Sequence, residues 1–203
     1  GYGLGGYMIE LVDASASLTL SNIVIDGAEC TVDAAHAAET DSIIKAANGG
    51  TIVLNSGAIL QNNKAAQFGS GILANNRVNI TMEDGAIIRN NTNRNYELGG
   101  GILIGNGSTF TMNGGEISGN KANSEGGAVH VLDKDCQFFL YDGKITGNTS
   151  GDGGAIYLNQ EPSWLIMQGG EISGNTATGN GGGVYIYRTG SVCQLYSGKI
   201  ENN

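Results

Sequence analysis

The chain contains an internal repeat of about 28 residues, and this period restricts the fold more than any other feature of the sequence. In each repeat a Gly is followed two residues later by Ile, and the Ile is followed three residues later by Asn. The repeats occur at Gly57/Ile59/Asn62, Gly85/Ile87/Asn90, Gly115/Ile117/Asn120, Gly143/Ile145/Asn148, Gly170/Ile172/Asn175 and Gly198/Ile200/Asn203. A unit of this length cannot bury its own apolar side chains, so such repeats fold by stacking on one another.

Two other segments keep the same period and alternate between apolar residues and other types. One follows a glycine cluster and begins at Ile72, Ile102, Val129, Ile156 and Val184. The other ends in Leu or Met, at Leu20, Leu54, Met82, Met112, Leu140, Met167 and Leu195. Short alternating segments separated by Gly, Asn and Ser are typical of β-strands. The sequence therefore predicts an all-β fold, a right-handed single-stranded parallel β-helix with three short strands per coil and about seven coils of about 28 residues.

Equivalent residues of neighbouring coils lie ~4.8 Å apart in such a fold, so each position of the repeat becomes a column. We expect one interior column to contain Ile59, Ile87, Ile117, Ile145, Ile172 and Ile200. Stacked side-chain amides can hydrogen-bond from coil to coil, and Asn also tolerates the positive φ of a sharp corner. The predicted structural asparagines are Asn62, Asn90, Asn120, Asn148, Asn175 and Asn203.

The repeat suggests a single β-helix domain over residues 1–203, with regular coils over residues 57–203. Residues 1–56 form degenerate N-terminal coils, in which equivalent residues are displaced by more than one period. The extra residues fall in an Ala-rich and acidic loop insertion at 31–41. Neither end of the sequence resembles a capping repeat, so we expect a fragment of a longer array.

Composition and charge exclude several classes of partner. The chain has 10 basic and 19 acidic residues, a formal net charge of −9, and no basic cluster. Nucleic-acid binding depends on Lys and Arg that displace counterions from phosphates, so we expect no nucleic-acid partner. No apolar run approaches the length of a membrane span, so we expect no membrane insertion by this segment. Cys30, Cys136 and Cys193 are too few for a disulfide framework or metal site, and we expect a monomer without metal or other cofactor.

No group of residues in the sequence predicts catalysis. A β-helix that cleaves polysaccharides needs carboxylates that converge on one bond, or a base beside bound Ca²⁺. Here Glu116, Lys144, Glu171 and Lys199 fall in one outward column and alternate in sign, which favours a charge ladder. The two histidines belong to no Ser/His/Asp or metal-binding pattern. We therefore expect the segment not to be an enzyme.

Two outward clusters supply the candidate ligand-binding residues. Strand alternation predicts an outward apolar stripe at Ile44, Leu73, Leu103, His130, Tyr157 and Tyr185, with Tyr187 beside its end. A second outward cluster contains Phe139, Tyr141, Trp164 and Ile166. A continuous apolar surface is typical of a contact with a partner. The candidate binding residues are therefore Leu103, His130, Tyr157, Tyr185, Tyr187, Phe139, Trp164 and Ile166. The alternative is that these residues only favour sheet formation and are covered by loops.

The motifs Gly126-Gly127-Ala128-Val129 and Gly153-Gly154-Ala155-Ile156 alternate with Ile117-Ser118-Gly119-Asn120 and Ile145-Thr146-Gly147-Asn148. In this alternation the chain resembles the repeats of the polymorphic outer-membrane proteins. It is also similar to the β-helical repeat regions of large surface proteins of gut bacteria, which belong to the pectin-lyase-like superfamily. The resemblance covers about residues 57–203 and implies an extracellular or bacterial cell-surface passenger, often adhesive.

Three functions are compatible with these observations. The first is an extracellular adhesion module that presents one β-helix face to a host protein or glycan. The second is a passive stalk or spacer that extends another domain from the cell. The third is a fragment of a polysaccharide-active β-helix enzyme, since the superfamily contains many such enzymes, although a shared fold does not establish a shared function.

Overall fold

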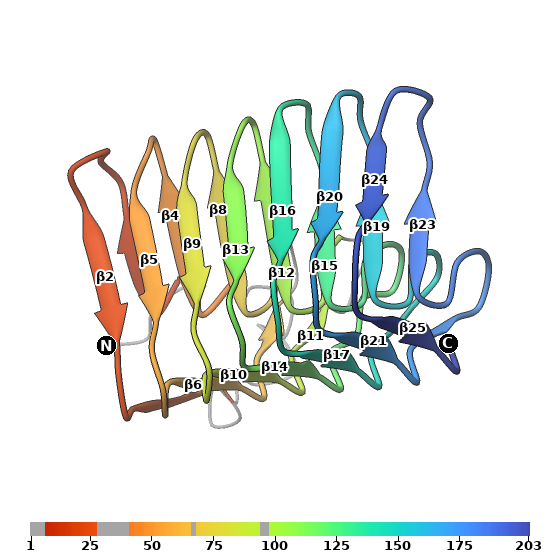
Figure 1. Ribbon diagram of the computed structural model, residues 1–203. Coiled ribbons are helices and arrows are strands. Elements are labelled where there is room, and N and C mark those ends of the chain that lie inside the picture. Colours follow the sequence, from red (N-terminus) through yellow and green to blue (C-terminus); the bar gives the residue numbers. More distant parts are fainter. Residues whose placement is uncertain (1–6, 28–40, 66–67, 94–97) are drawn as a thin grey trace, which may run out of the picture.

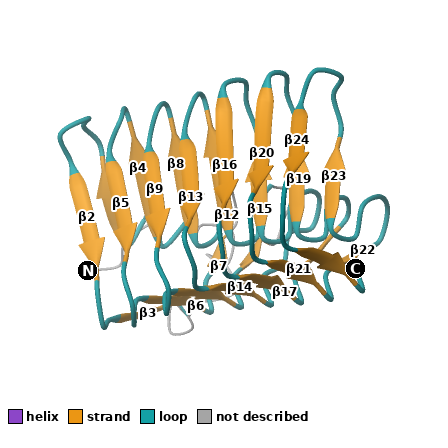
Figure 2. Cartoon of the chain, viewed as in Figure 1, coloured by secondary structure: helices purple, strands orange, loops and turns teal. Residues whose placement is uncertain are grey.

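A computed structural model of the protein describes residues 7–27, 41–65, 68–93 and 98–203. Every regular element in these ranges is a β-strand, and the chain winds through three parallel sheets in turn (Figures 1 and 2). Each of the three sheets has seven strands, so one strand from each sheet forms a rung and the protein has seven rungs. The predicted parallel β-helix is therefore confirmed.

The strands of each sheet follow one another in chain order. Sheet A contains β1 (Ile9–Leu11), β4 (Ile44–Ala47), β8 (Ile72–Asn75), β12 (Ile102–Gly105), β15 (Val129–Val131), β19 (Ile156–Leu158) and β23 (Val184–Ile186). Sheet B contains β2 (Ser17–Leu20), β5 (Thr51–Leu54), β9 (Asn79–Met82), β13 (Thr109–Met112), β16 (Cys136–Leu140), β20 (Ser163–Met167) and β24 (Val192–Leu195). Sheet C contains β3 (Val24–Asp26), β6 (Ile59–Gln61), β10 (Ile87–Arg89), β14 (Glu116–Ser118), β17 (Lys144–Thr146), β21 (Glu171–Ser173) and β25 (Lys199–Glu201). Two short pairs join β7 (Lys64–Ala65) to β11 (Thr92–Asn93) and β18 (Thr149–Ser150) to β22 (Thr176–Ala177).

The period of about 28 residues holds over the five turns from Leu60 to Ile200. The first two rungs are further apart in sequence, and Leu20 pairs with Leu54, 34 residues later. The insertion predicted at 31–41 lies outside the described residues, except for Asp41.

The interior is built from columns of apolar residues that keep their type from rung to rung. The predicted Leu and Met column from Leu20 to Leu195 is in register across all seven strands of sheet B. Two residues earlier in each strand, Phe110 and Phe138 stack with their ring centroids 4.7 Å apart. Since each side chain packs on its equivalents in the rungs above and below, a residue type that packs well in one coil packs well in the next.

The predicted interior Ile column is wrong in two coils. Leu60 and Ile88 are the buried residues there, whereas Ile59 and Ile87 are half-buried and lie in the outward column of Glu116. The reason is the corner glycine with positive φ, which precedes the interior residue by three positions in these coils and by two positions in the later ones. Ile200 has the predicted register but is 42% exposed, because its rung has a neighbour on one side only.

The asparagine ladder is displaced by one residue in the same two coils. The amides of the ladder belong to the buried Asn63, Asn91, Asn120, Asn148 and Asn175 and to the exposed Asn203 of the last rung. The predicted Asn62 and Asn90 instead have φ near +59° and +55° and form the corner itself. In these two coils one Asn has the positive φ of the corner and the next Asn forms the amide hydrogen bonds between coils. In the coils of Asn120, Asn148 and Asn175, Gly has the positive φ instead, and a single Asn follows it.

Candidate functional site

The predicted outward stripe on sheet A points away from the interior, but most of it is buried. Its register places Lys45, and not Ile44, in the column that continues through Leu73 and Leu103. Ile44 lies in the interior column, so its outward assignment is wrong. Leu103, His130 and Tyr157 are outward, yet they are only 1%, 0% and 1% exposed. The expectation of an exposed apolar stripe is therefore wrong for these three candidates.

The glycine-rich turns that precede the strands of sheet A cover this column. A Cβ placed on Gly126 would lie 2.9 Å from His130 Cβ, and one on Gly153 would lie 2.9 Å from Tyr157 Cβ. Both glycines have positive φ, near +68° and +63°, so the turn backbone packs directly on the outward side chains. The turns also pair with one another between rungs, since Gly126 N–H donates to the Asp152 carbonyl at 3.0 Å.

His130 is the most unusual residue beneath these turns. Neither of its ring nitrogens has a hydrogen-bond partner among the described residues, and the Glu125 carboxylate lies 3.8 Å from Nε2. Burial lowers the pKa of His130 to about 3, and the Glu125 backbone carbonyl, which does not reach good hydrogen-bond geometry, opposes this shift. Burial also raises the pKa of Glu125, whose carboxylate accepts a hydrogen bond from the Tyr157 hydroxyl. His130 and Tyr157 are closed to solvent and Glu125 is half-buried beside them, so the two rings offer no surface to a ligand.

The end of the stripe is more open. Tyr185 is half-buried and Tyr187 is 49% exposed, with the two ring centroids 6.3 Å apart. The Arg188 guanidinium lies 4.6 Å from the centre of the Tyr187 ring. Of the stripe residues proposed for binding, these two tyrosines alone remain accessible.

The second predicted cluster is part of a larger surface on sheet B. The outward side chains of β16, β20 and β24, together with the residue that follows each strand, form three columns across rungs five to seven. We call these nine residues the aromatic face: Gln137, Phe139, Tyr141, Trp164, Ile166, Gln168, Val192, Gln194 and Tyr196. All nine are half-buried or exposed, and none carries a formal charge.

The aromatic face is hollowed in the middle. A shallow depression of about 460 Å³ is lined by Phe139, Ile166, Gln168, Gln194 and Tyr196. Beside it, the rings of Phe139 and Tyr141 are nearly parallel, with centroids 6.1 Å apart. A volume of this size is within the range of sites for small molecules, so the depression can hold part of a ligand.

The sequence interpretation identified four of the nine residues, Phe139, Tyr141, Trp164 and Ile166. It missed Gln137, Gln168, Val192, Gln194 and Tyr196, which have the same place in the repeat. The available signal was their spacing of about one period from the recognised residues. Residue type changes from rung to rung on this face, so similarity of residue type does not reveal its columns.

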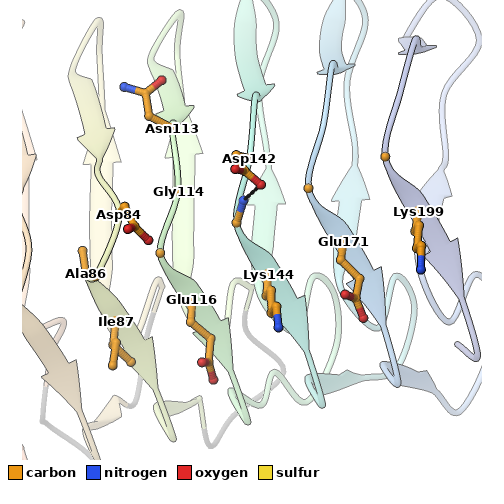
Figure 3. A pocket seen from close by; sticks show the side chains of 15 residues that line it. Asp84, Ala86, Ile87, Asn113, Gly114, Glu116, Asp142, Lys144, Glu171 and Lys199 are labelled. Carbon is orange, nitrogen blue, oxygen red and sulfur yellow. Dashed lines mark hydrogen bonds between the residues drawn. The ribbon is translucent and has the colours of Figure 1, made fainter.

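A longer groove runs along the corner between sheets B and C (Figure 3). Its volume is about 670 Å³, and its floor is formed by the corner glycines. A Cβ on Gly115 would lie 2.5 Å from the Ala86 carbonyl oxygen, so the packing of neighbouring corners itself requires glycine there. The groove is therefore explained by the fold without a ligand.

The charged residues along this groove do not converge. Glu116, Lys144, Glu171 and Lys199 project from successive strands in one column that alternates in sign, as predicted (Figure 3). These four side chains form no ion pair within 4.0 Å with one another. The two carboxylates are two rungs apart with a lysine between them, which is not the arrangement of a pair acting on one bond.

In residues 7–27, 41–65, 68–93 and 98–203, no three His, Cys, Asp or Glu side chains are grouped so that they could hold a metal ion. The same part of the chain contains no helix that is long and apolar enough to cross a membrane.

Comparisons with known proteins agree with the geometry. The family described as "Right handed beta helix region" matches residues 11–200, which is nearly the whole chain. Neither the curated proteins nor the solved structures gave a match. The fold occurs both in enzymes and in proteins without catalytic activity, so the match alone does not indicate a reaction. The extent of the match shows that this chain belongs to the right-handed β-helix family.

Proposed function

We propose that this chain is a binding module of a bacterial cell-surface or secreted protein, and that its ligand docks on the aromatic face. The observation that carries the proposal is a change along sheet B. In rungs two to four the equivalent outward positions hold mainly Thr and Asn, as at Thr51, Thr81 and Thr111. In rungs five to seven the same positions hold four aromatic residues and three glutamines.

Sheet formation alone does not account for this change. Thr and Val are sufficient to favour an exposed strand, and they occupy outward positions in the preceding three rungs of the same sheet. Tyr141 and Tyr196 are 42% and 68% exposed, so neither ring is used to complete the interior. Trp and Tyr are enriched where proteins contact ligands, because they bury a large rigid surface at a small cost in side-chain entropy. The resemblance to repeats of bacterial surface proteins supports an extracellular position for such a face.

The test compares three proteins on a panel of immobilised mucus glycoproteins, extracellular-matrix proteins and cell-wall polysaccharides. The double variant Tyr141→Ala/Tyr196→Ala is expected to lose at least about tenfold in affinity for the captured material, or about 1.4 kcal/mol. Tyr187→Ala removes a tyrosine that is 49% exposed and follows β23 of sheet A, and this variant should bind as the wild type does. Equal binding by the double variant would place the binding surface elsewhere on the protein, and no binding by the wild type would favour the passive stalk.

A further inference from the structure

The last column of the aromatic face places two tyrosines on either side of a glutamine. Tyr141, Gln168 and Tyr196 occupy equivalent positions, because their N–H groups donate to the equivalent carbonyls of Met112, Leu140 and Met167 at 2.8–2.9 Å. Parallel strands are ~4.8 Å apart, so the two tyrosines leave the backbone ~10 Å apart along the helix axis. The column therefore presents aromatic, amide and aromatic side chains in a straight line.

The depression beside this column lies over the middle rung. Ile166 and Gln168 come from that rung, while Phe139 comes from the rung before and Gln194 and Tyr196 come from the rung after. The depression is shallow and open to solvent, so it can take a segment of a long chain as well as a short ligand. Its direction is that of the helix axis, across successive rungs.

The absence of charge on the face restricts the ligand. The chain as a whole carries a formal charge of −9, yet none of the nine side chains is ionised. A charged ligand group that docked here would lose water without gaining an opposite charge, which is unfavourable. The three glutamines can each donate and accept hydrogen bonds, and the Tyr196 hydroxyl donates to Gln194 Oε1 at 3.3 Å. Side chains of this kind complement a neutral ligand that is rich in hydroxyl groups.

We infer that the aromatic face binds a neutral, extended β-linked glycan laid along the helix axis. In a β-1,4-linked chain every second sugar ring presents the same face, and the repeat of two rings is close to the spacing of two rungs. The apolar faces of alternate rings lie over Tyr141 and Tyr196, where aromatic carbon replaces water. The ring between them meets the Gln168 amide. This inference rests on the proposed binding function and names the class of its ligand.

The experiment measures binding of four soluble probes by affinity electrophoresis and calorimetry. Hydroxyethyl cellulose and chitohexaose are neutral and β-1,4-linked, dextran is neutral and α-linked, and polygalacturonate is acidic. The wild-type protein is expected to bind at least one of the first two and neither of the others. Because no charges pair in the complex, affinity should change by less than about twofold between low salt and about 1 M NaCl.

The variants locate the bound chain on the face. Tyr141→Ala and Tyr196→Ala should each weaken binding at least about tenfold, since each removes one stacking platform. Gln168→Glu keeps the shape of the side chain but adds a charge, and it should weaken binding to a similar extent. Tyr187→Ala should bind as the wild type does, and thermal unfolding of each variant should match the wild type to show that folding is intact.

The outcomes separate the ligand class from the site. If the neutral β-linked probes fail while a protein partner is captured in a Tyr141-dependent manner, the glycan inference is overturned and the proposed binding surface stands. Binding of polygalacturonate that weakens with salt would also overturn the inference. If the variants at Tyr141, Gln168 and Tyr196 bind every captured ligand as the wild type does, the inference and the proposed surface are both overturned.

Discussion

Replacing Asn148 by Ala is expected to lower the free energy of unfolding by about 2–4 kcal/mol. Asn148 Oδ1 accepts the Asn120 backbone N–H at 2.9 Å and the Asn120 side-chain amide at 3.0 Å. Its own amide donates to the Ile117 carbonyl at 3.0 Å and to Asn175 Oδ1 at 2.9 Å. Removing the side chain leaves the buried Asn120 N–H without its acceptor, and such groups are costly because water cannot reach them.

Urea unfolding followed by circular dichroism measures this loss. Asn113→Ala is the matched control, because the Asn113 side-chain amide donates to the Glu83 carboxylate on the surface at 3.0 Å. Its loss should change stability by less than about 0.5 kcal/mol. Asn148→Asp keeps the acceptor but turns a charged oxygen toward the Ile117 carbonyl, so it should destabilise at least as much as Ala. If Asn148→Ala unfolded at the same urea concentration as the wild type, the asparagine ladder would not be stabilising the stack of coils.

Acidification from pH 7.5 to pH 5 is expected to destabilise the fold by about 2 kcal/mol through His130 alone. The pKa of His130 falls from 6.5 to about 3 on folding, because the ring is fully buried. Between these two values the unfolded chain binds a proton that the folded chain does not. Stability is therefore complete above pH 6.5 and decreases as the pH falls toward 3.

The contribution of His130 to the pH dependence of stability is isolated by comparing two proteins that both lack His36. His36→Gln and His36→Gln/His130→Leu are unfolded in urea at a series of pH values from 7.5 to 5. Leu fits the column, since the preceding residue in it is Leu103. The His130→Leu protein should lack the loss of about 2 kcal/mol, and the Glu125 carboxylate, whose pKa burial raises, stays common to both. Identical pH profiles would show that His130 gains a partner or reaches water when protonated.

The sequence predicts the interior of this fold well, because a parallel stack repeats the same environment in every rung. Met82 and Met112, for example, meet equivalent neighbours one coil away, so their residue type is preserved and the period is visible. Where two similar residues are adjacent, the sequence does not show which of them points into the interior. Asn62 and Asn63 both fit the repeat, and only the backbone φ and the hydrogen bonds show which one joins the ladder.

The surface is harder to predict from the sequence, because alternation gives the direction of a side chain but not what lies over it. The pattern places His130 and Tyr157 outward correctly, whereas the path of the glycine turns that bury them is not periodic in residue type. On sheet B the reverse applies. Tyr196 is 68% exposed, but its neighbours on the face differ from it in residue type, so the shared surface is seen only in three dimensions.

The most direct test of the aromatic face uses Trp164, because it is the only tryptophan in the chain and lies within that face. Its fluorescence emission is followed while the protein is titrated with the material that the wild type captures. A saturable change in emission is expected for the wild type and for Tyr187→Ala, and at least about tenfold more ligand should be needed for Tyr141→Ala/Tyr196→Ala. Half-saturation at the same ligand concentration in the double variant and the wild type would contradict the assignment of this face as the binding surface.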